Sequence, residues 1–114
     1  MQIIKAIETN KVTRPACIIT ECSFEKKTID LAVAEISGRY PETGCCVNEQ
    51  CDEAAYIFEG TVNVTKKDGD THLLNSGDSV FISKDEPFFW EGNGKMVISC
   101  SPPWTPEQYK NVEG

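Results

Sequence analysis

Apolar and polar residues alternate along most of the chain, which is the pattern of half-buried β-strands rather than of helices. The longest alternating stretch covers residues 28–36, where Ile29, Leu31 and Val33 are predicted to form one face of a strand. Shorter β-type runs are predicted at residues 16–20, 55–59, 61–65, 71–74, 79–82, 88–91 and 95–100. Many short strands at regular spacing are typical of an all-β sandwich or barrel.

Glycine and proline separate these runs and predict where the chain turns. The Asp-Gly pair at residues 68–69 predicts a hairpin between the runs on either side of it. Gly60 is predicted to end one strand, and residues 92–94 are predicted to turn the chain before the last strand. Only residues 105–110 suggest a helix, a short one with Thr105 as its N-cap and a proline at its first position.

The net charge of the chain argues against some kinds of binding partner. The 114 residues, enough for one domain, carry 11 basic and 18 acidic side chains, a formal net charge of −7. Because nucleic-acid binding needs a positive surface, we expect no nucleic-acid partner. No apolar run approaches the roughly 20 residues that span a bilayer, and no secretory signal follows Met1. We therefore expect a cytoplasmic protein with no membrane partner.

The cysteines raise the question of metal or redox chemistry. Six are present: Cys17, Cys22, Cys45, Cys46, Cys51 and Cys100. Without an export signal they are expected to stay reduced. The spacing within the pairs 17/22 and 46/51 leaves a four-thiolate zinc site as an alternative, at the wide limit of zinc-ribbon spacing. We expect buried, unreactive thiols instead, because negative charges near Cys45 and Cys46 would raise their pKa.

Two segments carry a more specific signal. In residues 46–60, Glu53 is followed after six residues by a glycine, and in residues 77–88 a Gly-Asp pair precedes an apolar triplet and Pro87. These segments resemble the two motifs of the cupin superfamily, the small RmlC-like jelly-roll barrels. The ending at residues 102–108 is also similar to the tail of many small bacterial cupins.

The resemblance covers about residues 30–104 and implies an all-β fold, a single cupin-type jelly-roll barrel with a short C-terminal helical turn. The whole chain is then one domain, with N-terminal strands, a core and a tail at residues 1–27, about 28–104 and 105–114. Because small cupins are often homodimers, the resemblance also implies a homodimer. The outward positions expected for Tyr56, Phe58 and Phe89 suit such an interface.

The resemblance also bears on metal binding, because cupins hold a divalent metal through three histidines and one glutamate. The matching positions in this chain are Cys46, Asn48, Glu53 and Phe88. Only Glu53 keeps the family's residue type, and the single histidine, His72, lies outside both motifs. We therefore predict no metal and no cofactor, and an exposed or packed position for His72. A residual metal held by Cys46 and Glu53 is the alternative.

The same positions define a predicted ligand pocket. Strand alternation puts Phe88 and Trp90 on one face and Phe89 on the other, while Tyr40 is expected in a loop at the barrel mouth. The predicted pocket consists of Tyr40, Cys46, Asn48, Glu53, Phe88 and Trp90. An apolar wall with a few convergent polar groups is typical of small-molecule sites. In the alternative interpretation, Phe88 and Trp90 only fill the space that a metal site would occupy.

Glu53 is the candidate catalytic residue, because a buried carboxylate is costly and burial raises its pKa. A structural ion pair with Arg39 is the alternative. The favoured function is metal-independent binding of a small-molecule ligand, a sugar or an organic acid. Two other functions stay open: a structural or regulatory dimeric barrel without a pocket, and a metal-free isomerase or epimerase that uses Glu53 as acid or base. Whether the protein is an enzyme is left open.

Overall fold

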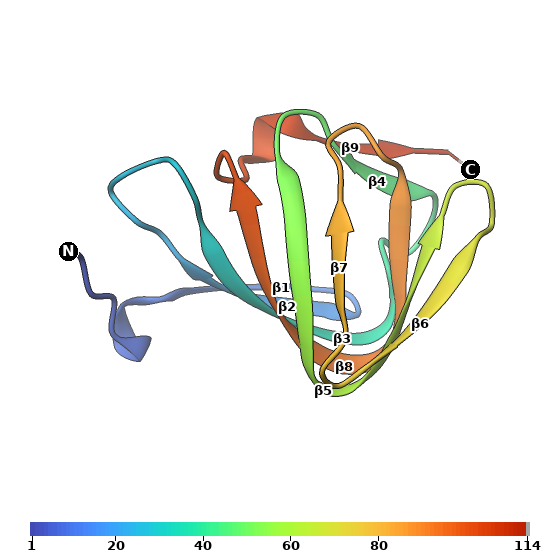
Figure 1. The fold of residues 1–114 in the computed structure, drawn as a ribbon, viewed down its shortest axis with the longest axis horizontal. Coiled ribbons are helices and arrows are strands. Elements are labelled where there is room, and N and C mark those ends of the chain that lie inside the picture. The colour runs from blue at the N-terminus through green and yellow to red at the C-terminus, as the bar shows by residue number, and fades with distance from the viewer. Residues whose placement is uncertain (114) are drawn as a thin grey trace.

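The strands of this chain curl into a half-barrel (Figure 1). In the computed structural model, which describes residues 1–113, nine strands form one antiparallel sheet. They are β1 (Asn10–Arg14), β2 (Cys17–Cys22), β3 (Leu31–Tyr40), β4 (Cys45–Asn48), β5 (Asp52–Lys66), β6 (Thr71–Asn75), β7 (Ser79–Ile82), β8 (Phe88–Ser101) and β9 (Tyr109–Val112). Two single-turn 3₁₀ helices, η1 (Ala6–Glu8) and η2 (Pro106–Gln108), complete the described elements. The predicted all-β jelly roll is confirmed.

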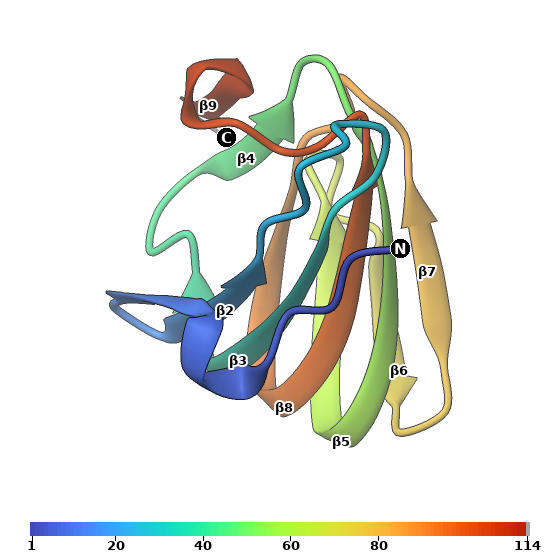
Figure 2. The same cartoon turned by 90° about the vertical axis from the view of Figure 1, so that its left-hand side faces the viewer.

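The long strands β5 and β8 pair along their whole length and organise the sheet. β3 lies on the other edge of β8, followed outward by β2 and β1, as Figure 2 shows from the side. β4 joins the end of β8 and carries β9 on its far edge, while β6 and β7 both pair with β5. Within residues 1–113, no helix is long and apolar enough to cross a membrane.

The predicted chain reversals at Gly60 and at residues 92–94 are wrong, because β5 and β8 each run through these glycines without a break. Gly60 pairs with Gly94 where the two strands bend together, and its φ is +74°. A Cβ atom at Gly60 would collide with the carbonyl oxygen of Asn93 and lie 2.8 Å from the Cα of Gly94. The glycines therefore mark a close approach of two bent strands rather than a turn.

The face predicted for Ile29, Leu31 and Val33 is not the most buried face of its strand. The strand begins at Leu31, and its buried side chains are Ala34 and Ile36, whereas Leu31 is exposed and Val33 only half-buried. Ala34 faces Met96, which is fully buried. Both faces of this strand carry apolar residues, so alternation alone could not tell which face is inward. The strand also continues to Tyr40, which the sequence had placed in a loop.

The C-terminal tail forms a shorter helix than predicted. Thr105 is the N-cap and Pro106 the first helical residue, as expected, but the helix ends at Gln108 and the chain continues as β9. The Gln108 side chain, 2% exposed, accepts hydrogen bonds from the backbone N–H groups of Gln50 and Cys51. These bonds and the pairing of β9 with β4 attach the tail to the barrel, so tertiary contacts limit the helix to one turn.

Candidate functional site

A cavity of about 730 Å³ lies on the concave side of the sheet and is partly open to solvent. All six residues of the predicted pocket line it: Tyr40, Cys46, Asn48, Glu53, Phe88 and Trp90. They come from β3, β4, β5 and β8, whose inward positions alternate with outward ones. Phe88 and Trp90 do not fill the space, and a barrel without a pocket is at odds with this cavity.

Glu53 is the only buried carboxyl group among the described residues, with 7% of its surface exposed. Its Oε1 accepts a hydrogen bond of 3.1 Å from Asn48 Nδ2, and the Cys100 thiol lies 3.9 Å from the same oxygen. Burial raises the pKa of Glu53 to about 7, with a smaller contribution from the charge of Asp30, while the Asn48 hydrogen bond opposes the rise. Near neutral pH both protonation states of this carboxyl group are therefore populated.

The alternative in which Arg39 pairs with Glu53 is not found. The guanidinium of Arg39 donates hydrogen bonds to the backbone oxygens of Pro41 and Gly44. It also stacks 3.7 Å from the centre of the Phe89 ring, and Phe89 points away from the cavity. Strand alternation explains the difference, because Arg39 and Tyr40 are neighbours on β3 and only one of them can face inward.

Sequence reasoning did not predict that the C-terminal tail, including Trp104, lines the cavity. Trp104 Nε1 donates a 3.0 Å hydrogen bond to Asn48 Oδ1, which fixes the orientation of the Asn48 amide toward Glu53. Asp30 accepts hydrogen bonds from the backbone N–H groups of Trp104 and Cys100 and so holds the tail in place. The family resemblance of the ending was a signal, but it did not indicate that Trp104 reaches the site.

Aromatic rings form one wall of the cavity. Phe88 and Trp90 are buried and pack edge to face, with ring centres 5.7 Å apart and planes at 85°. Tyr40 lies opposite Trp90 in the β3–β8 pairing and is half-buried. Tyr109, from β9, also lines the cavity and packs against Trp104. The cavity therefore combines these aromatic rings with the polar pair of Glu53 and Asn48.

The cysteines are all free thiols, and every one except Cys22 is buried. Burial raises the pKa of Cys17 to about 11 and raises the pKa of Cys46 further, with the charge of Glu53 adding to both. The Cys46 thiol also donates a hydrogen bond to the Phe88 carbonyl oxygen, at 3.4 Å. These thiols are protonated at neutral pH, which agrees with the expectation of unreactive side chains.

The residues at the cupin metal positions do not fit a divalent cation. Asn48 and Glu53 bind each other, the Cys46 thiol is bonded to the Phe88 carbonyl oxygen, and the Phe88 side chain offers no donor atom. In residues 1–113 no group of three or more His, Cys, Asp or Glu side chains is arranged to hold a metal ion. The zinc alternative fails for the same reason.

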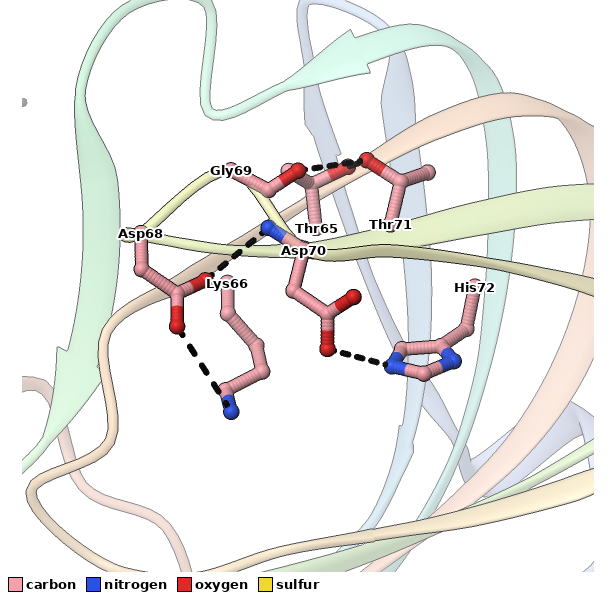
Figure 3. A network of polar contacts seen from close by, with 7 residues as sticks. All are labelled: Thr65, Lys66, Asp68, Gly69, Asp70, Thr71 and His72. Atoms are coloured by element: carbon pink, nitrogen blue, oxygen red, sulfur yellow. Dashed lines mark hydrogen bonds and ion pairs between the residues drawn. The ribbon is translucent and has the colours of Figure 1, made fainter.

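His72 lies on β6, outside the cavity lining. Figure 3 shows it in a polar network at the β5–β6 hairpin, where its Nε2 is 3.0 Å from Asp70 Oδ2. Asp68 and Gly69 form the predicted turn. The side chain of His72 is more than half exposed, as the sequence led us to expect.

The outer face of the sheet carries exposed aromatic side chains. Tyr56 and Phe58 are 50% and 42% exposed, and Phe89, also outside the cavity, lies against Arg39. Phe81, on β7, adds a further exposed ring to this side. Whether this face pairs with a second copy of the chain stays a prediction, as does the homodimer itself.

Comparisons with known proteins identify this curled antiparallel sheet as a cupin jelly roll. Residues 41–97 match the model of the EutQ-like cupin domain, and the chain belongs to this family. No curated protein matches the sequence.

Three solved structures illustrate the shared fold. Pac13 from Streptomyces, described as a unique nucleoside dehydratase, is 10% identical with a TM-score of 0.88, covering 99% of this chain and 92% of its own. Ectoine synthase from P. lautus is 16% identical with a TM-score of 0.78, covering 98% and 90%. The polyketide cyclase RemF from Streptomyces resistomycificus is 16% identical with a TM-score of 0.76, covering 98% and 85%. At these identities the likeness concerns the fold alone.

Proposed function

We propose that the cavity binds a small hydroxyl-bearing organic molecule, a sugar or a hydroxylated organic acid, without the help of a metal. The observation that carries this proposal is the hydrogen-bonded pair of Glu53 and Asn48, buried beside an open cavity of about 730 Å³. Small-molecule sites generally measure about 300–1,000 Å³ and combine apolar walls with a few convergent polar groups. A ligand hydroxyl has the chemistry to donate to the free oxygen of Glu53.

Two further features support this ligand class. The edges of Phe88 and Trp90 and the half-buried Tyr40 offer apolar and aromatic surface against which a ring can pack. A solved structure of Streptomyces PAC13, a protein of the same fold, contains uridine, which is a hydroxylated ring compound. At 11% identity this ligand is a guide to the choice of probes rather than to specificity.

The raised pKa of Glu53 favours a second candidate, a metal-free isomerase or epimerase with this residue as acid or base. A carboxyl group with a pKa of about 7 both accepts and returns a proton at neutral pH. The test is proton exchange: each bound compound is incubated with the protein in D₂O and followed by NMR. Loss of a C–H signal with wild type but not with Glu53→Gln supports catalysis, and no exchange with any bound compound excludes it.

The binding proposal is tested by calorimetric titration with neutral sugars, nucleosides and hydroxy acids. We expect at least one compound to bind, and Glu53→Gln to weaken it about tenfold, equivalent to about 1.4 kcal/mol, because glutamine replaces the accepting oxygen by an amide group. His72→Gln, an exposed site outside the cavity, is the matched control and should leave the affinity unchanged. Absence of binding across the panel, or equal affinity in wild type and Glu53→Gln, overturns the proposal.

A further inference from the structure

Arg14 faces the cavity from the end of the β1–β2 hairpin. In the pairing of these strands Arg14 lies directly opposite Cys17, and opposed residues of an antiparallel pair share a face of the sheet. Cys17 is buried and lines the cavity, and Val12 and Ile19, an opposed pair one step further along, line it as well. Arg14 is part of the same lining, so the hairpin carries a guanidinium group to the cavity rim.

The guanidinium of Arg14 has no partner within residues 1–113, either by hydrogen bond or by ion pair. The other arginine, Arg39, differs in this respect, because backbone oxygens and the Phe89 ring occupy it. Lys27 also lines the cavity, but its ammonium group donates to the Phe24 carbonyl oxygen. Arg14 is thus the cation of the lining whose donors are all available to a ligand.

The pKa of the Cys17 thiol is affected by the charges of both Arg14 and Glu53. Burial raises its pKa to about 11, the positive charge of Arg14 opposes this rise, and the negative charge of Glu53 adds to it. Arg14 also opposes the raised pKa of Tyr40. Both charged side chains line the same cavity of about 730 Å³, and both act on the Cys17 thiol.

The acidic residue of the hairpin does not cancel this cation. Glu21 lines the cavity too, but it lies four residues from Cys17 along β2, a separation of about 13 Å between Cα atoms. Its Oε1 accepts a hydrogen bond of 2.9 Å from Asn10 Nδ2, at the opposite end of the hairpin from Arg14. Glu42, beside Tyr40, also lines the cavity, but it forms no ion pair with Arg14. One cavity therefore contains the unpaired Arg14 guanidinium and the hydroxyl-accepting pair of Glu53 and Asn48.

We propose that Arg14 is an anion-binding residue of this cavity and that the ligand carries a carboxylate or phosphate group for it to bind. The planar guanidinium has the fork geometry that pairs with two oxygens of such groups. The hydroxyl groups at the other end of the ligand then meet Glu53 and Asn48. In a chain with a net charge of −7, an unpaired cation at the rim also provides local attraction for an anion. This inference rests on the proposed function and names the charge of its ligand.

The test compares neutral and anionic members of matched pairs by calorimetric titration at low salt. The probes are glucose with gluconate and glucose 6-phosphate, and uridine with uridine 5′-monophosphate. We expect an anionic member to bind at least tenfold tighter than its neutral partner, and Arg14→Gln to abolish that difference. Arg14→Lys should retain part of it. The gluconate and phosphate arms show which anion the site prefers.

Lys11→Gln is the matched control, because Lys11 lies on the same strand with its side chain on the opposite face and loses the same charge. It should keep the preference for the anionic member. Neutral members that bind as tightly as anionic ones overturn the role of Arg14 while the proposed function stands. Equal loss of the preference in Lys11→Gln and Arg14→Gln overturns it as well, since general charge would then explain the effect. Failure of every probe to bind overturns both proposals.

Discussion

Replacement of Glu53 by glutamine is expected to stabilise the folded protein at pH 8 and to change its stability little at pH 4. In the folded protein the pKa of Glu53 is about 7, whereas the ordinary value is 4.5. Between these two values the folded state binds more protons than the unfolded state. Its free energy of unfolding therefore falls as pH rises through this window.

The size of the effect follows from the shift in pKa. Each pKa unit corresponds to about 1.4 kcal/mol, so the wild-type protein should lose about 3 kcal/mol from this group between pH 4 and pH 8. Glutamine cannot ionise, and its side-chain oxygen still accepts the hydrogen bond from Asn48. The variant should therefore lack this loss, and the difference from wild type should appear only above about pH 5.

The measurement is urea unfolding followed by tryptophan fluorescence from pH 4 to pH 8.5, with wild type and Glu53→Gln side by side. The difference between the two curves removes the contribution of the other titrating groups. Glu49→Gln, at an exposed position four residues earlier, is the control for the loss of one carboxyl group, and the gain in stability above pH 5 is expected for Glu53→Gln alone. Parallel curves for wild type and Glu53→Gln would contradict the raised pKa.

The direction of this pH dependence separates two roles for Glu53. An ion pair with an arginine would hold the pKa of the carboxyl group below its usual range and would stabilise the protein at neutral pH. The structure instead buries Glu53, and the Asn48 amide and the Cys100 thiol offset only part of the cost of its charge. A group that lowers stability where it ionises is better explained by binding or proton transfer than by structural support.

The sequence was sufficient for the fold and for the inward set of pocket residues. The first motif places Cys46 and Asn48 on one strand and Glu53 on the next strand along the chain, and alternation assigns Phe88 and Trp90 to one face. These inferences are local, because they need only the period of a strand and the spacing within a motif. The structure brings all five residues to one cavity for the same reason.

The missed features depend on contacts between distant segments. Trp104 reaches Asn48 from 56 positions away, and Arg14 faces the cavity only because β1 and β2 extend the sheet beyond the cupin motifs. No periodicity in either segment indicates this placement. The chain reversals predicted at Gly60 and at residues 92–94 were wrong for a different reason. A glycine signals an unusual backbone or a close approach, but the local sequence does not say whether the chain reverses or bends.

The bend at Gly60 leads to the second large expected effect, because Gly60→Ala should lower the free energy of unfolding by about 3 kcal/mol or more. A positive φ of +74° already costs a non-glycine residue about 1–2 kcal/mol. The new methyl group would in addition collide with the backbone of Asn93 and Gly94, which cannot move without separating β5 from β8. The melting temperature should fall by more than 10 °C, at roughly 4–8 °C for each kcal/mol.

Gly69→Ala is the matched control, because Gly69 also has a positive φ, +95°, but no atom lies within 4 Å of its would-be Cβ. It should show only the conformational part of the loss, about 1–2 kcal/mol. Urea unfolding of both variants at one pH isolates the steric part as the difference between them. A Gly60→Ala protein that does not fold beside a folded Gly69→Ala protein agrees with the prediction. Equal losses would mean that the close approach of β5 and β8 is dispensable, and the curvature that encloses the cavity would then need another origin.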